Sequence, residues 1–387
     1  MRTRHTLVVT PDLHSAIIAG ARAITARPVS VATGVLLVAQ QLGDKPQPGD
    51  VVVPLGVDGI TCTSTAIAGQ LPGPHGPVPA GGVRITGPSL RLLLPDDTDA
   101  AADVYDRQIR AFGADGQHLL GNLRVGVVGA GGTGSAVVEQ LVRLGVGEIL
   151  VIDPDTINDD GSNVTRVYGS TMADRGVAKV ALAQRNADRI GLGSELNAVQ
   201  GTINDEAVAR LLTDRDVIFG CTDDNRGRVT LGRLATWYLI PVIDMGVKLT
   251  SRDGRLQAIE GRITVIDPGV GCLQCRGRIN AMALQAEILT PGERAQRVDE
   301  GYAVGLDEQD PAVVTFTTGV AAHAASELLQ RLFVLDDGSP SSELIIRFHA
   351  RDIRRNSRAG VPGHWCVDAR NLGAGDTVPF LGTTWTS

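Results

Sequence analysis

Residues 124–166 read RVGVVGAGGTGSAVVEQLVRLGVGEILVIDPDTINDDGSNVTR, and their pattern is typical of a nucleotide-binding unit. An apolar run, a glycine-rich turn, a helix-like segment and a second apolar run that ends at Asp153 follow one another. In such a unit the glycines let backbone amides approach an anion at the helix N-terminus. A carboxylate at the end of the second strand can accept hydrogen bonds from ribose hydroxyls. The stretch therefore predicts a nucleotide site that contains Gly129, Gly131, Gly132, Gly134 and Asp153.

Polar residues beyond this unit distinguish a triphosphate from a dinucleotide. Asn163 and Arg166 lie in a polar loop, and Lys179 opens a helix-like run. Together these groups suit polyphosphate oxygens. Asp223 follows an apolar run at 216–221, which places it at the carboxyl edge of a parallel sheet, where it could carry Mg²⁺. We therefore predict that the site binds ATP. The alternative is an NAD(P)-dependent oxidoreductase, which would leave Arg166, Lys179 and Asp223 unexplained.

Alternating strands and helices fill the chain from about residue 99 to 246. We expect helices at 133–144, 175–190, 204–213 and 224–238, between the apolar runs 123–129, 148–153, 196–201, 216–221 and 240–246. Such alternation predicts a parallel sheet with helices on both faces. Residues 247–268 alternate with period two and predict antiparallel strands, and 313–333 predict a long helix. The expected fold class is α/β, with a Rossmann-like mixed sheet in a domain spanning 99–387.

Residues 1–98 predict a separate small α+β domain. We expect strands at 5–10 and 31–40, a helix at 13–24, and a strand pair at 83–87 and 90–95. The order strand, helix, strand resembles the start of JAB-type metalloproteases. That family needs a His-x-His pair, and none of the seven histidines is so spaced. We therefore favour a structural or peptide-binding domain over a degenerate protease.

Composition and apolar run lengths argue against nucleic-acid binding, membrane insertion and secretion. A net charge of −7 and an aromatic content of 3% argue against a nucleic-acid footprint and against base-stacking platforms. The first apolar run is too short for a signal peptide, and no run approaches the length of a membrane span, so we expect a cytoplasmic protein. Five cysteines are too few for a secreted disulfide framework.

Two of these cysteines form a metal-binding motif. Cys272 and Cys275 have the spacing of a zinc knuckle, and His364 with Cys366 could complete a Cys₃His tetrahedron. The alternative is a degenerate site in which the cysteines only pack.

From about Tyr105 to the C-terminus the sequence resembles the ThiF/MoeB/HesA adenylating enzymes, relatives of the ubiquitin-activating enzymes. The motifs are RQI at 107–109, GxGGxG, DPD at 153–155, N-x-x-R with a lysine thirteen residues on, CTDDN at 221–225, and CxxC. The loop 153–166 is about two residues longer than is usual in that family.

The resemblance implies a role for each motif. Asp153 would bind ribose, and Asn163, Arg166 and Lys179 would bind phosphates. Asp223 would bind Mg²⁺, and Asp155 and Asn225 would belong to the nucleotide site. Arg107 would reach across a homodimer interface into the partner's ATP site.

The predicted reaction is attack of a carboxylate on the α-phosphorus of ATP, with pyrophosphate leaving. Cations stabilise the growing charge, and no general base is needed because a carboxylate is ionised at neutral pH. The substrate implied is a ubiquitin-like or sulfur-carrier protein, or a peptide. Residues 276–311 follow the CxxC motif, and we expect them to form a flexible cover over the substrate's tail. They contain no cysteine, so we expect no thioester intermediate. A catalytically silent partner subunit is the other alternative.

Overall fold

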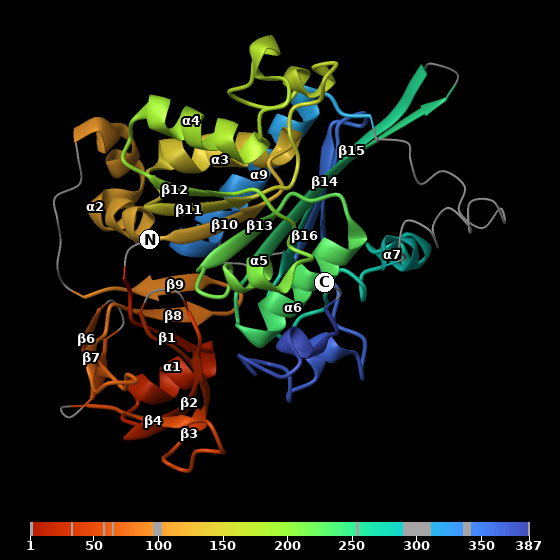
Figure 1. The fold of residues 1–387 in the computed structure, drawn as a ribbon. Helices are drawn as coiled ribbons and strands as arrows, with labels where there is room; N and C mark the ends of the chain where they lie inside the picture. Colours follow the sequence, from red (N-terminus) through yellow and green to blue (C-terminus); the bar gives the residue numbers. More distant parts are fainter. Residues whose placement is uncertain are drawn as a thin grey trace.

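The computed structural model describes residues 3–31, 34–56, 59–63, 66–95, 103–252, 255–288, 311–335 and 342–385. Most of the segment predicted to cover the site, 289–310, therefore lies outside the described residues. The described chain forms an eight-stranded sheet, a six-stranded sheet and a small three-stranded sheet (Figure 1).

The eight-stranded sheet confirms the predicted mixed α/β fold. Its order is β12 (Glu195–Val199), β11 (Glu148–Ile152), β10 (Arg124–Val128), β13 (Val217–Gly220), β14 (Val242–Arg252), β15 (Arg255–Ile266), β16 (Glu343–Arg347) and β17 (Asp352–Asn356). The first five strands are parallel, and the pairings from β14 to β17 are antiparallel. The pair β14–β15 extends beyond the rest of the sheet (Figure 1).

Helices cover both faces of this sheet, because the buried strand residues alternate between two apolar clusters. One face carries α3 (Gly132–Leu144), α4 (Lys179–Ile190) and α9 (Val314–Phe333), and the other carries α5 (Glu206–Arg210) and α6 (Asn225–Trp237). Two more helices are α2 (Asp106–Asn122) and α7 (Ala281–Ile288). The helices predicted at 175–190 and 204–213 are shorter than expected. The first starts only at Lys179, because Ala178 still forms a β-bridge with Thr156.

The six-stranded sheet is built from the N-terminal part of the chain. Its order is β4 (Val51–Pro54), β2 (Ala23–Val29), β3 (Leu36–Leu42), β1 (Thr6–Val9), β8 (Gly82–Thr86) and β9 (Leu90–Leu93), with α1 (Pro11–Ile18) packed beside it. The three-stranded sheet has β5 (Ile60–Cys62), β6 (Ile67–Leu71) and β7 (Val78–Pro79).

Two N-terminal predictions were wrong at their ends. The helix expected at 13–24 stops at Ile18, because Gly20 has a φ of 97°, and residues 23–29 form a strand instead. The strand expected at 31–40 begins only at Leu36.

A buried ion cluster joins the N-terminal sheet to the starts of β10 and β13. The Asp216 carboxylate, just before β13, lies 2.5 Å from the Arg4 guanidinium and 3.6 Å from that of Arg84. It also accepts a hydrogen bond from the Arg124 amide, 2.9 Å away. Burial acts to raise the pKa of Asp216, yet Arg4 and Arg84 hold it below its ordinary value. The N-terminal sheet therefore docks at the edge where these strands begin and leaves the opposite edge to the glycine turn.

Residues 371–377, here called the C-terminal clasp, form a second joint. The Gly373 and Gly375 amides donate to carbonyls at the end of α6, at 2.9 Å each. From the N-terminal sheet, Gln40 Nε2 donates to the Gly373 carbonyl at 2.5 Å, and the Ser30 amide donates to Asp376 at 2.7 Å. The clasp therefore lies between α6 and the strands β2 and β3.

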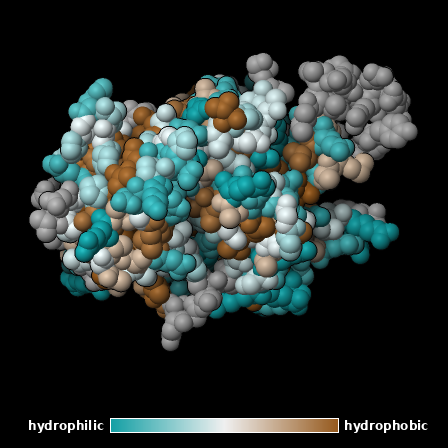
Figure 2. Space-filling model, turned by 90° about the horizontal axis from the view of Figure 1, so that it is seen from below, coloured by the Kyte–Doolittle hydropathy of each residue, from teal (hydrophilic) through white to brown (hydrophobic). Residues whose placement is uncertain are grey.

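The described surface is mixed in polarity. Seen from below, apolar residues form small patches among hydrophilic ones (Figure 2). Within the described ranges no helix is both long and apolar enough to cross a bilayer.

Candidate nucleotide and metal sites

The glycine turn follows β10 and requires glycine at specific positions. Gly129 has a φ of 97°, and a Cβ there would lie 2.6 Å from the Cys221 carbonyl oxygen. A Cβ at Gly134 would lie 1.8 Å from the Gly129 carbonyl oxygen. Beside Gly131, the N-cap of α3, a Cβ would meet no atom within 4 Å. The N-terminus of α3 therefore has space beside it and no capping side chain, so its backbone amides can bind an anion.

Asp153 and Lys179 meet beside this turn. Asp153 is 4% exposed and accepts hydrogen bonds from the Ala130 amide at 2.6 Å and the Asp155 amide at 2.8 Å. Lys179 Nζ lies 2.7 Å from an Asp155 carboxylate oxygen and 3.8 Å from one of Asp153. Burial raises the pKa of Asp153, an effect that Lys179 opposes. The structure thus brings together the predicted ribose ligand and the predicted phosphate ligand.

The loop between them places Arg166 over the turn and turns Asn163 inward. The Arg166 Cδ atom lies 3.4 Å from the position of a Cβ on Gly132. Asn163 is buried and binds Asn158, accepting from its amide at 2.9 Å and donating to its side chain at 3.2 Å. Asn163 therefore shapes the loop in this structure, while Arg166 packs beside Gly132 and donates from Nη1 to the Ser162 carbonyl at 3.4 Å.

Two adjacent carboxylates follow β13 and differ in their surroundings. Asp224 caps α6, accepting from the Gly227 amide at 2.6 Å and from Asn204 Nδ2 at 2.8 Å. Asp223 is exposed and, within the described residues, makes no hydrogen bond or ion pair. Its carboxylate is therefore available to a cation at the carboxyl edge of the sheet.

Asn225, also predicted in the nucleotide site, is bound by α7. Its Nδ2 and its backbone amide both donate to the Glu287 carboxylate, at 2.9 and 3.0 Å. The Arg226 amide donates to the same carboxylate at 2.7 Å, and Asn225 Oδ1 accepts from the Asn280 amide at 3.0 Å. Sequence reasoning missed Glu287, since a glutamate 62 residues away carries no spacing signal.

Arg107 lies at the wrong end of α3 to serve the glycine turn of its own chain. It is exposed near the start of α2, and its neighbour Gln108 donates at 2.8 Å to the carbonyl of Arg143, in the last turn of α3. The glycine turn lies at the first turn of α3. At 1.5 Å per residue the two ends of this helix are about 18 Å apart, well beyond the reach of one side chain.

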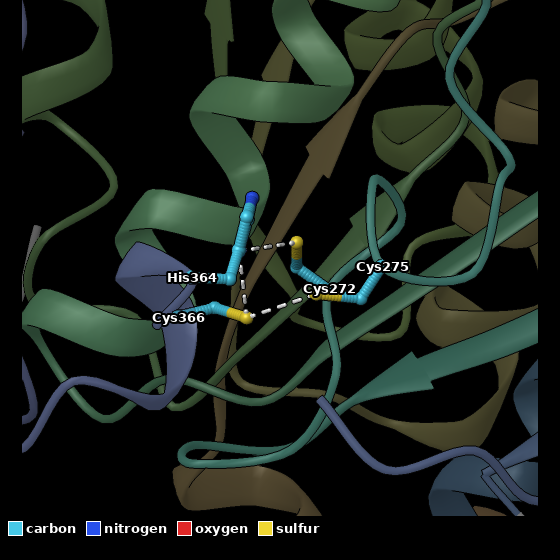
Figure 3. A group of neighbouring side chains, drawn as sticks. All are labelled: Cys272, Cys275, His364 and Cys366. Atoms are coloured by element: carbon cyan, nitrogen blue, oxygen red, sulfur yellow. Dashed lines mark hydrogen bonds between the residues drawn. The ribbon is translucent and has the colours of Figure 1, made fainter. Parts of the chain in front are cut away.

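The predicted metal ligands converge on one point (Figure 3). The ligand atoms of Cys272, Cys275, His364 and Cys366 all lie within 4.8 Å of one another, and the three cysteines are buried. His364 Nδ1 lies 3.1 Å from Cys366 Sγ and 3.7 Å from Cys272 Sγ. Three thiols and one imidazole around a common centre fit the closed tetrahedral set of a structural zinc ion.

Comparisons with known proteins agree with this geometry. Residues 105–360 match the ThiF family. Molybdopterin-synthase adenylyltransferase of Escherichia coli (strain K12) is 31% identical over 195 residues, covering 48% of this chain and 74% of that protein. Sulfur carrier protein ThiS adenylyltransferase of Bacillus subtilis (strain 168) is 23% identical over 221 residues, covering 53% of this chain and 66% of that protein.

A solved structure shares the fold. Escherichia coli MccB with ATP has a TM-score of 0.52 and 18% identity, covering 68% of this chain and 74% of that chain. The chain therefore belongs to the ThiF family and is an adenylyltransferase.

Proposed function

We propose that the protein activates the C-terminal carboxylate of a ubiquitin-like or sulfur-carrier protein, or of a peptide, as an acyl-adenylate. The observation that carries this proposal is the gathering of Asp153, Arg166 and Lys179 around the glycine turn. Relatives named for molybdopterin synthase and for the sulfur carrier ThiS support the carrier-protein substrate. Structures of MccB with MccA support a peptide as the second possibility.

In the proposed reaction a carboxylate oxygen forms a bond to the α-phosphorus of ATP. The bond from that phosphorus to the bridging oxygen breaks, and pyrophosphate leaves with the electron pair. Arg166 and the amides of the glycine turn hold the phosphates, Lys179 moves from Asp155 to a phosphate oxygen, and Asp153 binds the ribose. Asp223 would hold Mg²⁺, which would neutralise charge on the leaving pyrophosphate.

The open edge of β14 supports an extended chain as substrate. β13 pairs with β14 only as far as Asp244, yet β14 continues to Arg252 with β15 as its one described neighbour. An extended segment can add to such an edge through backbone hydrogen bonds. A C-terminal tail lying there would end beside Gly220 and the glycine turn.

The position of Arg107 supports a homodimer with composite sites. Because α3 separates Arg107 from its own glycine turn, the guanidinium can serve a triphosphate only in another subunit. The acyl group would then pass to an outside nucleophile, since no cysteine follows the metal motif within 276–311. The Cys₃His set would hold Zn²⁺ in a structural role, because all four positions around the ion are protein ligands.

Pyrophosphate exchange tests the proposal. Labelled pyrophosphate should enter ATP only when a candidate carrier or peptide with a free C-terminal carboxylate is present. The same substrate as its C-terminal amide is the matched control. Exchange supported equally by the amide would reject the proposal, and so would the absence of exchange with every free carboxylate tested in a protein that reduces NAD(P)⁺.

A further inference from the structure

A second cluster of charged groups lies one strand beyond the glycine turn. Asp244, on β14, is fully buried, and Arg262 Nη2 lies 2.6 Å from its Oδ2. Arg228 Nε, on α6, lies 3.5 Å from its Oδ1. Neither Oδ1 nor that Nε makes a hydrogen bond within the described residues. Arg228 and Arg262 therefore share the Asp244 carboxylate, and Arg228 Nε has no acceptor among the described residues.

Gly246 forms the floor of this cluster. It pairs directly with Arg262 across β14 and β15, so both residues face the same side of the sheet. A Cβ on Gly246 would meet only Arg228 Nη2 within 4 Å, at 3.4 Å. Each guanidinium side chain is 17% exposed. The space above Gly246 is therefore bordered by two arginines and is accessible from solvent.

This cluster, here called the Gly246 cradle, adjoins the nucleotide position. A Cβ on Gly220 would lie 3.2 Å from Asp244 Oδ1, and the following Cys221 carbonyl abuts Gly129. Along the carboxyl edge of the sheet the order is thus the ribose ligand on β11, the glycine turn on β10, Asp223 after β13, and the cradle on β14. A molecule in the cradle would lie next to the phosphate position on the side away from the ribose.

The cradle carries one positive charge in excess. Arg228 and Arg262 face a single carboxylate, and the two guanidiniums repel each other. Glu343, another carboxylate that acts on Asp244 and Arg262, is already bound by Arg278 through two hydrogen bonds of 2.8 and 2.9 Å. Arginine forks in a partly dry site bind carboxylates through charge-assisted hydrogen bonds.

We propose that the Gly246 cradle receives the substrate carboxylate, with Arg262 and Arg228 as positioning residues that hold it against the α-phosphate. This inference rests on the proposed function and names the residues that select a free acid. Glycine at position 246 lets the backbone of the incoming tail approach β14 closely. Holding the carboxylate in place converts the attack into a step between two bound groups.

Binding of a small carboxylate tests the cradle apart from catalysis. The probes are triglycine as the free acid and as the C-terminal amide, titrated by saturation-transfer NMR in the presence of a non-hydrolysable ATP analogue. The free acid should bind at least about tenfold more tightly than the amide, the effect of one charge-assisted contact. Arg262→Met should abolish that preference, and Arg262→Lys should restore part of it.

Arg354→Met is the matched control. Arg354 lies in the same cross-strand row, two strands away on β17, and is 61% exposed. It should leave the preference unchanged. Should Arg262→Met fail to fold, the double variant Arg262→Met/Asp244→Asn removes both buried charges together. Equal binding of acid and amide by the wild type, or an unaltered preference in Arg262→Met, would overturn the proposal.

The two hypotheses fail in different ways. Selective binding of the free acid without pyrophosphate exchange for any carboxylate would keep the cradle and reject adenylation of a carboxylate. Pyrophosphate exchange with the same KM for the carboxylate in wild type and Arg262→Met would keep adenylation and reject the cradle.

Discussion

Asp223 and Asp224 are adjacent residues with the same side chain and different surroundings. Asp224 has a structural role, because its carboxylate caps α6 and accepts a hydrogen bond from Asn204. Asp223 is exposed and has no partner within the described residues. We propose that Asp223 binds a cation, because its carboxylate lies at the edge where parallel sheets bind ligands.

This contrast predicts opposite phenotypes for two alanine variants. Asp223→Ala should keep the Tm of the wild type and lose roughly 10²–10³-fold in pyrophosphate exchange, because it removes electrostatic stabilisation of the leaving group. Asp224→Ala should lower stability by about 1 kcal/mol, the usual effect of losing an N-cap. Thermal unfolding and exchange assays on both variants check this. An Asp223→Ala protein with full exchange activity would remove the magnesium assignment.

The residues predicted for the nucleotide site carry local signals in the sequence. Glycines in a strand–turn–helix unit and a carboxylate at a strand end have positions that the backbone fixes. The Gly246 cradle was not predictable in this way. Its three charged residues come from one helix and two strands, and they meet only because β14 and β15 pair in one particular register. The use of Asn225 by α7 likewise depends on tertiary packing.

At the scale of elements, α6 and α7 hold each other at their ends. Glu287 accepts from the first two amides of α6, where the helix dipole favours a negative charge. Asn225 in turn binds Asn280, just before α7. Since Asp223 directly precedes Asp224, the N-cap of α6, this contact links the position of α7 to that of Asp223, the predicted magnesium ligand.

Removing this link should therefore affect both α7 and catalysis. Glu287→Ala should speed hydrogen–deuterium exchange of the amides at 281–288 and lower the pyrophosphate exchange rate. Gln285→Ala, an exposed position on the same helix, is the control and should change neither. Unchanged amide exchange in Glu287→Ala would show that other contacts hold α7.

Regular elements were predicted where an apolar run or a helical period extended over the whole element. The parallel strands and α9 are of this kind. β2 was missed because the apolar residues of α1 continue into it, and only Gly20 with its positive φ separates the two. β16 and β17 were missed because β17 is an exposed edge strand rich in arginine, and its strand structure comes from pairing with β16 and not from an apolar pattern.

At the scale of the whole molecule, the C-terminal clasp connects the metal site to the N-terminal sheet through hydrogen bonds. His364 and Cys366 lie a few residues before the C-terminal clasp, and Asn371 donates from the clasp to the Trp365 carbonyl at 3.0 Å. The clasp in turn binds the N-terminal sheet through Gln40 and Ser30. A metal ion that fixes Trp365 would therefore also fix the clasp.

Loss of the metal should loosen the N-terminal sheet before it disturbs the nucleotide site. Cys366→Ser, or a strong zinc chelator, should lower the Tm by at least about 5 °C, because closed zinc sites contribute directly to folding. Hydrogen–deuterium exchange should rise in 23–29 and 36–42 and stay low in 124–128. Cys62→Ser, outside the metal site, is the control. A metal-free wild type of unchanged Tm and exchange would contradict this prediction.

Composite sites predict complementation between two inactive variants. Arg107→Ala should dimerise normally and adenylate far more slowly, at a cost of about 2–4 kcal/mol in the transition state. Mixing it with Asp223→Ala should restore one complete site per heterodimer and a sizeable fraction of the activity. Size-exclusion chromatography and pyrophosphate exchange after subunit exchange measure both. Two variants that stay inactive after confirmed exchange would place Arg107 outside the partner's site.

Transfer of an oxygen label from the substrate to AMP tests whether the protein adenylates a carboxylate. The substrate carboxylate is labelled with ¹⁸O, and the bound acyl-adenylate is then cleaved with an added amine such as hydroxylamine. If the carboxylate attacks the α-phosphorus, its oxygen bridges carbon and phosphorus, and one ¹⁸O should appear in AMP by mass spectrometry. Unlabelled AMP, or ADP as the nucleotide product with the ¹⁸O in inorganic phosphate, would contradict attack of the carboxylate on the α-phosphorus.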